Sequence, residues 1–389
     1  MHIKTGKILS DNTEALKSFL EQIYYVDRSI QNCTYNGDGI NIELDAESTP
    51  DREQIKTEIL KLADSILSSF ERVETRVISE SDGKGLFNKD PMEELTKTRQ
   101  VVQTHPGVYA LQGEFLDTIR NMDALFRRYA LERGATEQYF QPTLPIKSFV
   151  ENGYISSFPH HPMFVTTVER NAESIRTLSR DAREQTVESI HQWLDEKLDD
   201  HDQILSPTVC YHCFETLRNQ AIPCSGAQFT AIAPCHRHES LSIQGLARLQ
   251  TFTMREIVFF GSADFVGNCI EEILEHGKTI LSEWGVQFRI VTASDPFFAG
   301  GAELKRIYQS TMSLKYEIQA YLPHAESWLS IASFNNHQQS LVEPYVIKFD
   351  ANKPLHSGCV GYGYERMAYA MYSQFGCDKN KWHTRAFSQ

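Results

Sequence analysis

The stretch from Cys235 to Gly261, CHRHESLSIQGLARLQTFTMREIVFFG, is decisive for the fold. It predicts two strands joined by a polar loop, with Arg237 and Glu239 on one strand face because side chains repeat every second residue. Phe252 and Glu256 follow within an apolar run. A guanidinium can fork onto phosphate oxygens, a carboxylate can accept from an amino group, and an aromatic ring can stack on a base. The stretch therefore favours a nucleotide-binding hairpin.

A second stretch, Ser357 to Arg366, reads SGCVGYGYER and follows about 100 residues later. In this order, the two stretches resemble motif 2 and motif 3 (Gly-x-Gly-x-Glu-Arg) of the class II aminoacyl-tRNA synthetases. The resemblance implies an α+β fold in which an antiparallel sheet is flanked by helices. Apolar periodicity predicts strands over 287–293, 316–322 and 328–334 and a helix from Asp264, which suits such a sheet.

Composition sets broad limits on function. The 389 residues are 41% hydrophobic and 23% charged, as in ordinary globular proteins. No apolar run is long enough for a bilayer, and the first residues lack the apolar stretch of a signal peptide. Eight scattered cysteines in such a chain suggest reduced thiols and a cytoplasmic location. The net charge of −13 makes extensive tRNA binding unlikely, although acidic chains can carry local basic faces.

The chain divides into two predicted domains. A helical face over 13–24, a hairpin around Asn36-Gly37-Asp38-Gly39 and a helix capped by Thr49 predict a small α+β accessory domain over residues 1–105. The catalytic domain is predicted over residues 106–389, starting with a helix over 113–133 that Gly134 ends. A charged helical segment over 169–198 and a loop over 295–301 lie farther along. The helix followed by the extended segment around Pro142 resembles motif 1, which implies a homodimer.

Glu256 and Cys359 fall at the strands of the two motifs, and Cys210 could supply a third ligand. Two thiolates and a carboxylate suit zinc and leave a fourth position open. The methanogenic-type seryl-tRNA synthetases, and the amino acid:[carrier protein] ligases related to them, hold an active-site zinc with Cys, Glu and Cys in this order. The resemblance implies that zinc binds the amino group of the substrate here as well. Cys213 remains a packed thiol or a redox partner of Cys210.

The resemblance covers roughly residues 115–375 and is strongest to the carrier-protein ligases. The stretches that carry it are GYISSFP from Gly153, RLQTFTMRE from Arg248, DPFF from Asp295 and SFNNHQ from Ser333. It implies activation of a small amino acid, glycine or alanine before serine, with ATP and Mg²⁺. The aminoacyl group would then pass to the phosphopantetheine thiol of a carrier protein.

Roles for single residues follow from the same resemblance. Arg237 and Arg366 are expected to act catalytically on the α- and γ-phosphates. Glu239 is expected to bind the adenine amino group, and Phe252 to stack on the ring. Two further arginines, Arg248 and Arg255, are left between phosphate binding and ion pairing, with Arg248 included among the cofactor-binding residues. Glu317 and Asn335 are the expected substrate contacts, although the Lys315-x-Glu317-x-Gln319 strand departs from the seryl pattern.

Two other functions stay open at this stage. One is a seryl-type tRNA synthetase whose first ~105 residues bind tRNA. The other is a catalytically inactive paralogue with a regulatory role, against which the intact Arg237, Phe252 and Arg366 argue.

Overall fold

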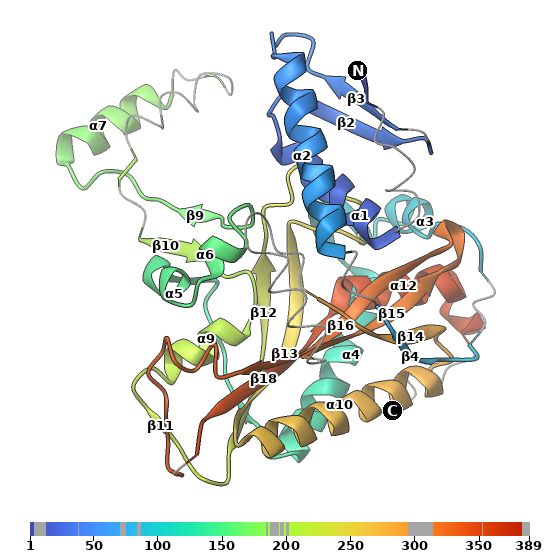
Figure 1. Ribbon diagram of the computed structural model, residues 1–389, viewed down its shortest axis with the longest axis vertical. Coiled ribbons are helices and arrows are strands. Elements are labelled where there is room, and N and C mark those ends of the chain that lie inside the picture. Colours follow the sequence, from blue (N-terminus) through green and yellow to red (C-terminus); the bar gives the residue numbers. More distant parts are fainter. Residues whose placement is uncertain are drawn as a thin grey trace.

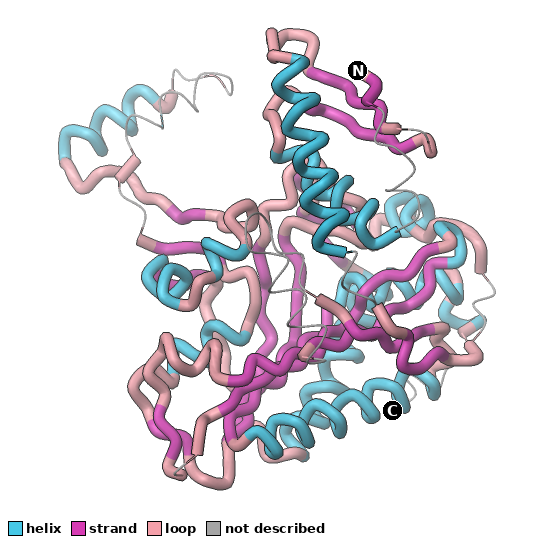
Figure 2. The backbone as a smooth tube through the Cα atoms, viewed as in Figure 1, coloured by secondary structure: helices cyan, strands magenta, loops and turns pink. Residues whose placement is uncertain are grey.

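A computed structural model describes residues 1–3, 13–37, 39–70, 75–83, 87–183, 202–294, 314–351 and 353–382, together with residues 186, 194, 198 and 199 (Figures 1 and 2). The main feature is an eight-stranded sheet, antiparallel except where β12 pairs with β7. Its strands, in spatial order, are β4 (Val77–Glu80), β14 (Phe288–Thr292), β15 (Lys315–Leu322), β16 (Ser327–Gln338), β18 (His356–Gly363), β13 (Thr251–Gly261), β12 (Ala227–His236) and β7 (Thr136–Glu137). The expected α+β fold with an antiparallel sheet and flanking helices is confirmed.

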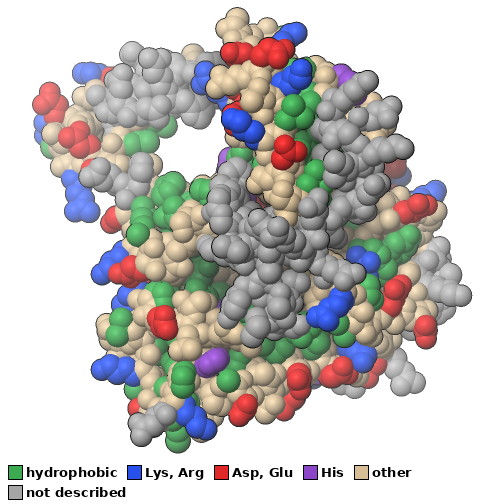
Figure 3. All heavy atoms as spheres, viewed as in Figure 1, with side chains coloured by type: hydrophobic (Ala, Val, Ile, Leu, Met, Phe, Trp, Pro, Cys, Tyr) green, Lys and Arg blue, Asp and Glu red, His purple; other side chains and the backbone are tan. Residues whose placement is uncertain are grey.

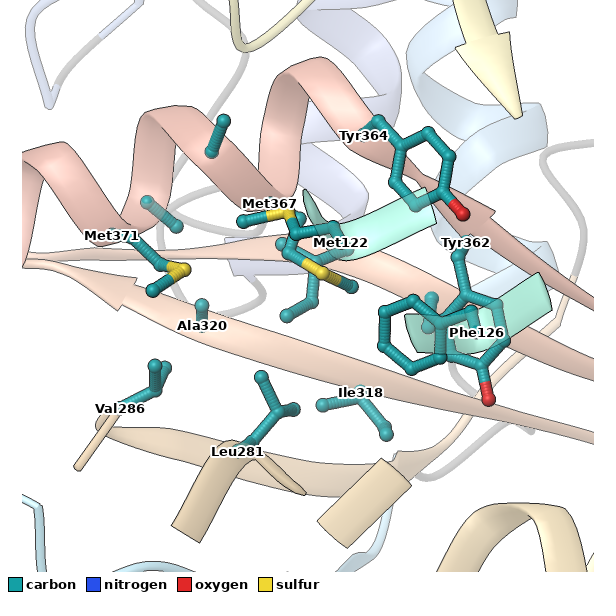
Figure 4. Packing of buried hydrophobic residues seen from close by; sticks show 14 of the residues in the cluster. Met122, Phe126, Leu281, Val286, Ile318, Ala320, Tyr362, Tyr364, Met367 and Met371 are labelled. Carbon is teal, nitrogen blue, oxygen red and sulfur yellow. The ribbon is translucent and has the colours of Figure 1, made fainter. Parts of the chain in front are cut away.

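Three long helices cover one face of this sheet: α4 (Gly113–Glu132), α10 (Ala263–Glu283) and α12 (Tyr364–Phe375). The large hydrophobic core lies between the helices and the sheet. Figure 4 shows Met122 of α4 beside Met367 of α12, and Phe126 of α4 beside Tyr362 of β18, with Ile318 of β15 below them. The helices therefore take up one face, and the opposite face is left for chemistry.

The first residues form a separate module, which we call the N-terminal module (residues 1–3 and 13–70). A three-stranded sheet, β1 (His2–Ile3), β3 (Ile40–Leu44) and β2 (Ile30–Tyr35), packs with α1 (Thr13–Gln22), η1 (Ile23–Tyr25) and α2 (Arg52–Phe70). The predicted helix at 13–24 and the strands of the predicted hairpin are present, while Asp38 of its turn lies outside the described residues. The cap of α2 differs from the expectation, because Asp51 and not Thr49 accepts the N–H groups of Glu53 and Gln54, each at 3.1 Å.

The hydrophobic cores divide earlier than the expected boundary at residue 105. The core of the N-terminal module ends at Leu67, whereas Leu95 and Val101 are buried in the large core. Strand β4 also joins the main sheet by pairing with β14. We therefore propose that the accessory domain ends near residue 70 and that the catalytic domain begins at β4.

The remaining elements surround the sheet. They are α3 (Met92–Lys97), β5 (Val101–His105), β6 (Val108–Leu111), β8 (Thr143–Pro145), α5 (Ile146–Glu151), α6 (Tyr154–Ser157), β9 (Phe164–Val165), α7 (Ala172–Asp181), β10 (Gln203–Leu205), α9 (Cys210–Thr216), β11 (Ala221–Ile222), η2 (Pro323–Ala325), β17 (Lys348–Phe349) and η3 (Lys379–Lys381). Of the helical segment expected over 169–198, the structure describes α7, and most of the rest lies outside the described residues. The loop predicted at 295–301 also lies outside them. Among the described helices, none has the length and apolarity needed to cross a bilayer.

The hairpin from Cys235 to Gly261 differs from the sequence prediction in one respect. Strand β12 ends at His236, so Arg237 and Glu239 lie in the following loop and not on a strand face. This β12–β13 loop (residues 237–250) turns back through a hydrogen bond from the Arg237 N–H to the Gln250 carbonyl, at 2.9 Å. Ser240 in the loop has a φ of 47°, a left-handed conformation that a continuing strand excludes.

Candidate active site

Three buried side chains that can ligate a metal converge on the sheet face opposite the long helices. Glu256 comes from β13 and Cys359 from β18, while Cys210 opens the short helix α9. One ligand atom from each of the three lies within 4.8 Å of the other two. The strand register explains why Glu256 and Cys359 lie close together. Val258 faces Cys359 directly, and Glu256 is two residues from Val258 on the same side of β13. The structure thus brings together the three residues that the sequence suggested as ligands.

Burial and the contact between the two cysteines set the ionisation of this cluster. Burial raises the pKa of Glu256 to about 7, and charge on Cys359 adds to the increase, whereas hydrogen bonds from Thr208 and the Val209 N–H oppose it. The hydrogen bond with Cys210 lowers the pKa of Cys359 well below its usual range, against the effect of burial. The pKa of Cys210 is raised well above its usual range by its hydrogen bond with Cys359 and by burial. Three such groups can be anionic together in a buried site only beside a cation. The donor set therefore fits a divalent metal such as zinc.

Neighbouring groups hold the ligand atoms in place. The carboxylate of Glu256 accepts from the N–H groups of Val209 at 3.1 Å and Cys210 at 2.9 Å, and from the hydroxyl of Thr208. Around the sulfur of Cys359 lie Asn335 Nδ2 and His337 Nε2, each at 3.5 Å. Such supporting contacts orient metal ligands and set how tightly they bind.

A row of facing residues, three of them small, crosses the sheet at the cluster on the same face. Ala231, Glu256, Gly361, Ser333 and Glu317 face one another in turn across β12, β13, β18, β16 and β15. A Cβ at Gly361 would meet the Met254 Cε at 2.5 Å, the Glu256 Cγ at 3.5 Å and the Ser333 Oγ at 3.6 Å. Small residues thus line the face beside the cluster, and the Met254 side chain covers part of the space over Gly361.

The expected substrate residues lie around this space. Asn335 reaches Cys359 and also donates to the Ser333 hydroxyl at 3.3 Å. Glu317 lies at the far end of the row, where Lys315 is 3.4 Å away and the amide of Gln319 donates to it at 3.3 Å. Both stand on the face of the cluster, with Asn335 the nearer of the two.

The name nucleotide cradle is used for the five residues that the sequence predicts to bind ATP: Arg237, Glu239, Arg248, Phe252 and Arg366. They lie in or next to the β12–β13 loop. The Arg237 guanidinium carbon lies 5.1 Å from the centre of the Phe252 ring, and its Nε donates to the Pro207 carbonyl at 3.1 Å. Pro207 directly precedes the segment that supports Glu256. The cradle and the metal cluster are thus neighbouring parts of one site.

Arg248 and Arg255, for which the sequence left phosphate binding and ion pairing open, lie in different surroundings. Arg248 donates to the Glu239 carboxylate through Nε at 2.8 Å, and its Nη1 pairs with Glu21. Arg255 is on the helix-covered face, 1% exposed, where it binds Asp123 of α4 at 2.6 Å. The open alternative for Arg255 is therefore decided in favour of an ion pair inside the core.

Motif 3 joins the cradle through the start of α12. The Arg366 Nε donates to the Ala247 carbonyl in the β12–β13 loop at 2.8 Å. Burial lowers the pKa of Arg366, and the nearby guanidinium groups of Arg248 and Arg237 lower it further. Glu365 accepts from the Thr253 N–H at 2.8 Å and so fixes the start of β13 against α12. The two motifs are thereby held together, and three guanidinium groups are gathered within one short region.

Comparison with known proteins agrees with this geometry. Residues 190–375 match the tRNA synthetase class II core domain (G, H, P, S and T). The chain is 30% identical to amino acid–[acyl-carrier-protein] ligase 2 of Bradyrhizobium diazoefficiens, over 75% of this chain and 85% of that protein. It is 29% identical to ligase 1 of the same organism, over 75% of this chain and 87% of that protein. The chain belongs to the class II aminoacyl-tRNA synthetase family.

Other members of the class II family are also similar. The type-2 serine–tRNA ligase of Methanopyrus kandleri is 27% identical, over 79% of this chain but only 61% of that protein. The crystal structure of M. kandleri SerRS in complex with A. aeolicus tRNASec superimposes with a TM-score of 0.69 and 21% identity, over 92% of this chain and 73% of that one. As a class II protein whose relatives include ligases, the chain is an enzyme of the ligase class.

Two contacts of this class II site were missed by sequence reasoning. His337 touches Cys359 because it follows Asn335 by two residues on β16 and so points to the same face of the sheet. Its position two residues after Asn335 was the available signal. Glu21 reaches Arg248 from the N-terminal module, and no local pattern announces a contact between such distant residues.

Proposed function

We propose that the enzyme activates a small amino acid with ATP and transfers it to the phosphopantetheine thiol of a carrier protein. The observation that carries this proposal is the buried Cys210–Glu256–Cys359 cluster beside an arginine-rich nucleotide cradle. The ligases of B. diazoefficiens, whose names state an amino acid and an acyl-carrier protein, support the choice of acceptor.

The cluster is the proposed zinc site, with Cys210, Glu256 and Cys359 as ligands. When bound, zinc would supply a Lewis-acid position for the amino group of the substrate, which must be deprotonated to ligate. Asn335 stands against Cys359 and is placed to orient the substrate beside it. This arrangement selects amino acids over hydroxy acids.

The size of the substrate follows from the row of small residues. We infer that Ala231, Gly361 and Ser333, which face one another across the strands, bound the space for the substrate side chain, with Glu317 at the far end of the row. Glycine or alanine fits such a space better than a larger amino acid. Rejecting one additional methylene group supplies about 1–3 kcal/mol, so serine is expected as a weaker substrate.

Activation needs no protein nucleophile. A carboxylate oxygen of the amino acid attacks the α-phosphorus of ATP, the bond to the bridging oxygen breaks, and pyrophosphate leaves. Arg237 neutralises the α-phosphate and Arg366 the γ-phosphate, and Mg²⁺ bound with ATP would supply further positive charge. Phe252 stacks on the adenine, whose amino group Glu239 binds. The carrier thiolate then attacks the adenylate carbonyl, and AMP is released.

The acceptor separates this proposal from the second candidate, a seryl-type tRNA synthetase. On the face that Figure 3 shows, acidic and basic side chains alternate over the coloured part of the N-terminal module and form no basic stripe. The overall charge is −13, which also favours a protein acceptor over a polyanion. We further propose a cytoplasmic enzyme, because all eight cysteines are free thiols.

The test begins with ATP–pyrophosphate exchange in the presence of each amino acid in turn. We expect glycine or alanine to support exchange, and Arg237→Ala to lower it on the order of 100-fold or more because a transferring phosphate loses one charged contact. Arg120→Ala, an exposed arginine on α4, is the matched control and should be silent. Failure of every amino acid would favour an inactive paralogue.

The adenylate is then offered total tRNA and phosphopantetheinylated carrier protein. The proposed function predicts a product on the carrier that hydroxylamine cleaves, ribonuclease leaves intact and the apo carrier does not form. Label on RNA that is sensitive to ribonuclease would contradict it and would assign the N-terminal module to tRNA binding.

A further inference from the structure

The N-terminal module touches the loop that carries the nucleotide cradle. The hydroxyl of Tyr25, in η1, donates to the His238 carbonyl at 2.8 Å. The Tyr25 ring also meets the rings of His238 and His160 edge-on, with centroids 6.1 and 5.1 Å away. In Figure 1, α1 and α2 stand at the end of the molecule where the loop between β12 and β13 lies. A module with a core of its own therefore rests on the cradle.

Arg248 is the centre of this contact. Its Nε and Nη2 lie 2.8 and 2.6 Å from the Glu239 carboxylate, and its Nη1 pairs with Glu21, near the end of α1. The Arg248 and Glu21 side chains are each 16% exposed. Burial lowers the pKa of Arg248, but the two carboxylates outweigh it and leave the pKa raised. All three nitrogen atoms of the guanidinium group are thus occupied by carboxylates.

Glu21 also lies within the field of the cradle as a whole. Burial and the charges of Arg248 and Arg237 lower the pKa of Arg366, and Glu21 opposes them. Carboxylates and phosphates are the two anions that match the guanidinium fork, so they compete for the same donors. Glu21 is the anion that the N-terminal module brings to this group of three arginines.

We propose that Glu21 binds Arg248 in the place that a phosphate of ATP takes, so that ATP displaces the N-terminal module from the cradle. This inference rests on the proposed function, because it takes the bound anion to be the triphosphate. Glu239 keeps its contact with Arg248, and only the Glu21 side of the guanidinium group is exchanged. Docking of the module and binding of ATP then weaken each other by the same factor.

The experiment measures the Kd of Mg·ATP for the full chain by calorimetry, without amino acid. Glu21→Gln keeps the shape of the side chain and removes the competing charge. We expect its Kd to fall about tenfold, within the range of ordinary couplings between sites. Glu47→Gln, an exposed glutamate of the same module, is the matched control and should keep the Kd of the wild type.

Tyr25→Phe supplies a second variant that leaves Arg248 and its partners untouched. It removes the hydrogen bond to His238 and should lower the Kd in the same direction by a smaller factor. If the Kd of Glu21→Gln is unchanged, the inference is wrong. If that Kd is higher, the inference is also wrong, because Glu21 then positions Arg248 for ATP. If the wild-type protein binds no Mg·ATP, the result would instead contradict the proposed function.

Discussion

At the scale of single residues, the two candidate thiolate ligands have a natural comparison in Cys213. Cys210 and Cys213 both lie in α9 and both are buried, but only Cys210 approaches Glu256 and Cys359. The side chain of Cys213 packs among apolar residues around Phe214 and Tyr345. One helix therefore holds a candidate ligand and a packed thiol that differ in position and not in exposure.

This difference predicts the metal content of three variants. Cys359→Ser and Cys210→Ser should each lose bound zinc, because a serine hydroxyl is a poor replacement for a thiolate. Cys213→Ser should retain about one zinc per chain, although its buried hydroxyl should lower the stability of the fold. Elemental analysis of the purified proteins after dialysis measures this directly. Zinc retained in both ligand variants would refute the assignment.

At the scale of elements, the register of five strands creates the space beside the cluster. A methyl group at Gly361 would meet the Met254 Cε at 2.5 Å, and the flexible end of that side chain can move away. The same methyl group would then occupy the space between Glu256 and Ser333. The sheet should tolerate Gly361→Ala, while the substrate space becomes smaller.

Gly361→Ala should therefore raise the KM for the amino acid and leave the KM for ATP unchanged. The loss for alanine should exceed that for glycine, and a penalty of about 1–3 kcal/mol corresponds to roughly 10–200-fold. Pyrophosphate exchange with both amino acids measures the effect. Gly267→Ala in α10, where an added Cβ meets no atom within 4 Å, is the matched control. Equal KM values in wild type and Gly361→Ala would place the substrate elsewhere.

The sequence predicted strands and helices of the catalytic sheet because their apolar periods are strong and their motifs are specific. Glu256 and Cys359 could be brought together from the sequence, since both lie on strands of recognisable motifs. The extension of β12 through Arg237 was wrong, because alternation of charged residues continues past His236 while the backbone turns. The ion pair between Glu21 and Arg248 joins two modules, and only tertiary packing reveals it.

At the scale of the whole molecule, the two edges of the main sheet differ in their surroundings. Beyond the β7 edge, Tyr139 next to the segment resembling motif 1 is 81% exposed, and Val150 in α5 and Phe164 in β9 are 63% and 50% exposed. Exposed apolar side chains such as these are the ones that an interface with another protein would cover. At the opposite edge, the short strand β4 exposes Val77 and Ile78.

We propose that the enzyme is a homodimer that joins through the segment containing Pro142. Phe164→Asp should then shift the protein toward monomer in sedimentation velocity, because a charge would be buried in the interface. Ile78→Asp is the matched control: it replaces a side chain of similar exposure, 53% against 50%, at the opposite edge of the sheet. Its sedimentation should match that of the wild type.

Pyrophosphate exchange measured down to nanomolar protein then relates assembly to activity, and specific activity should fall as the dimer dissociates. Wild-type protein that sediments as a monomer and keeps full activity at those concentrations would rule out the dimer as the working form.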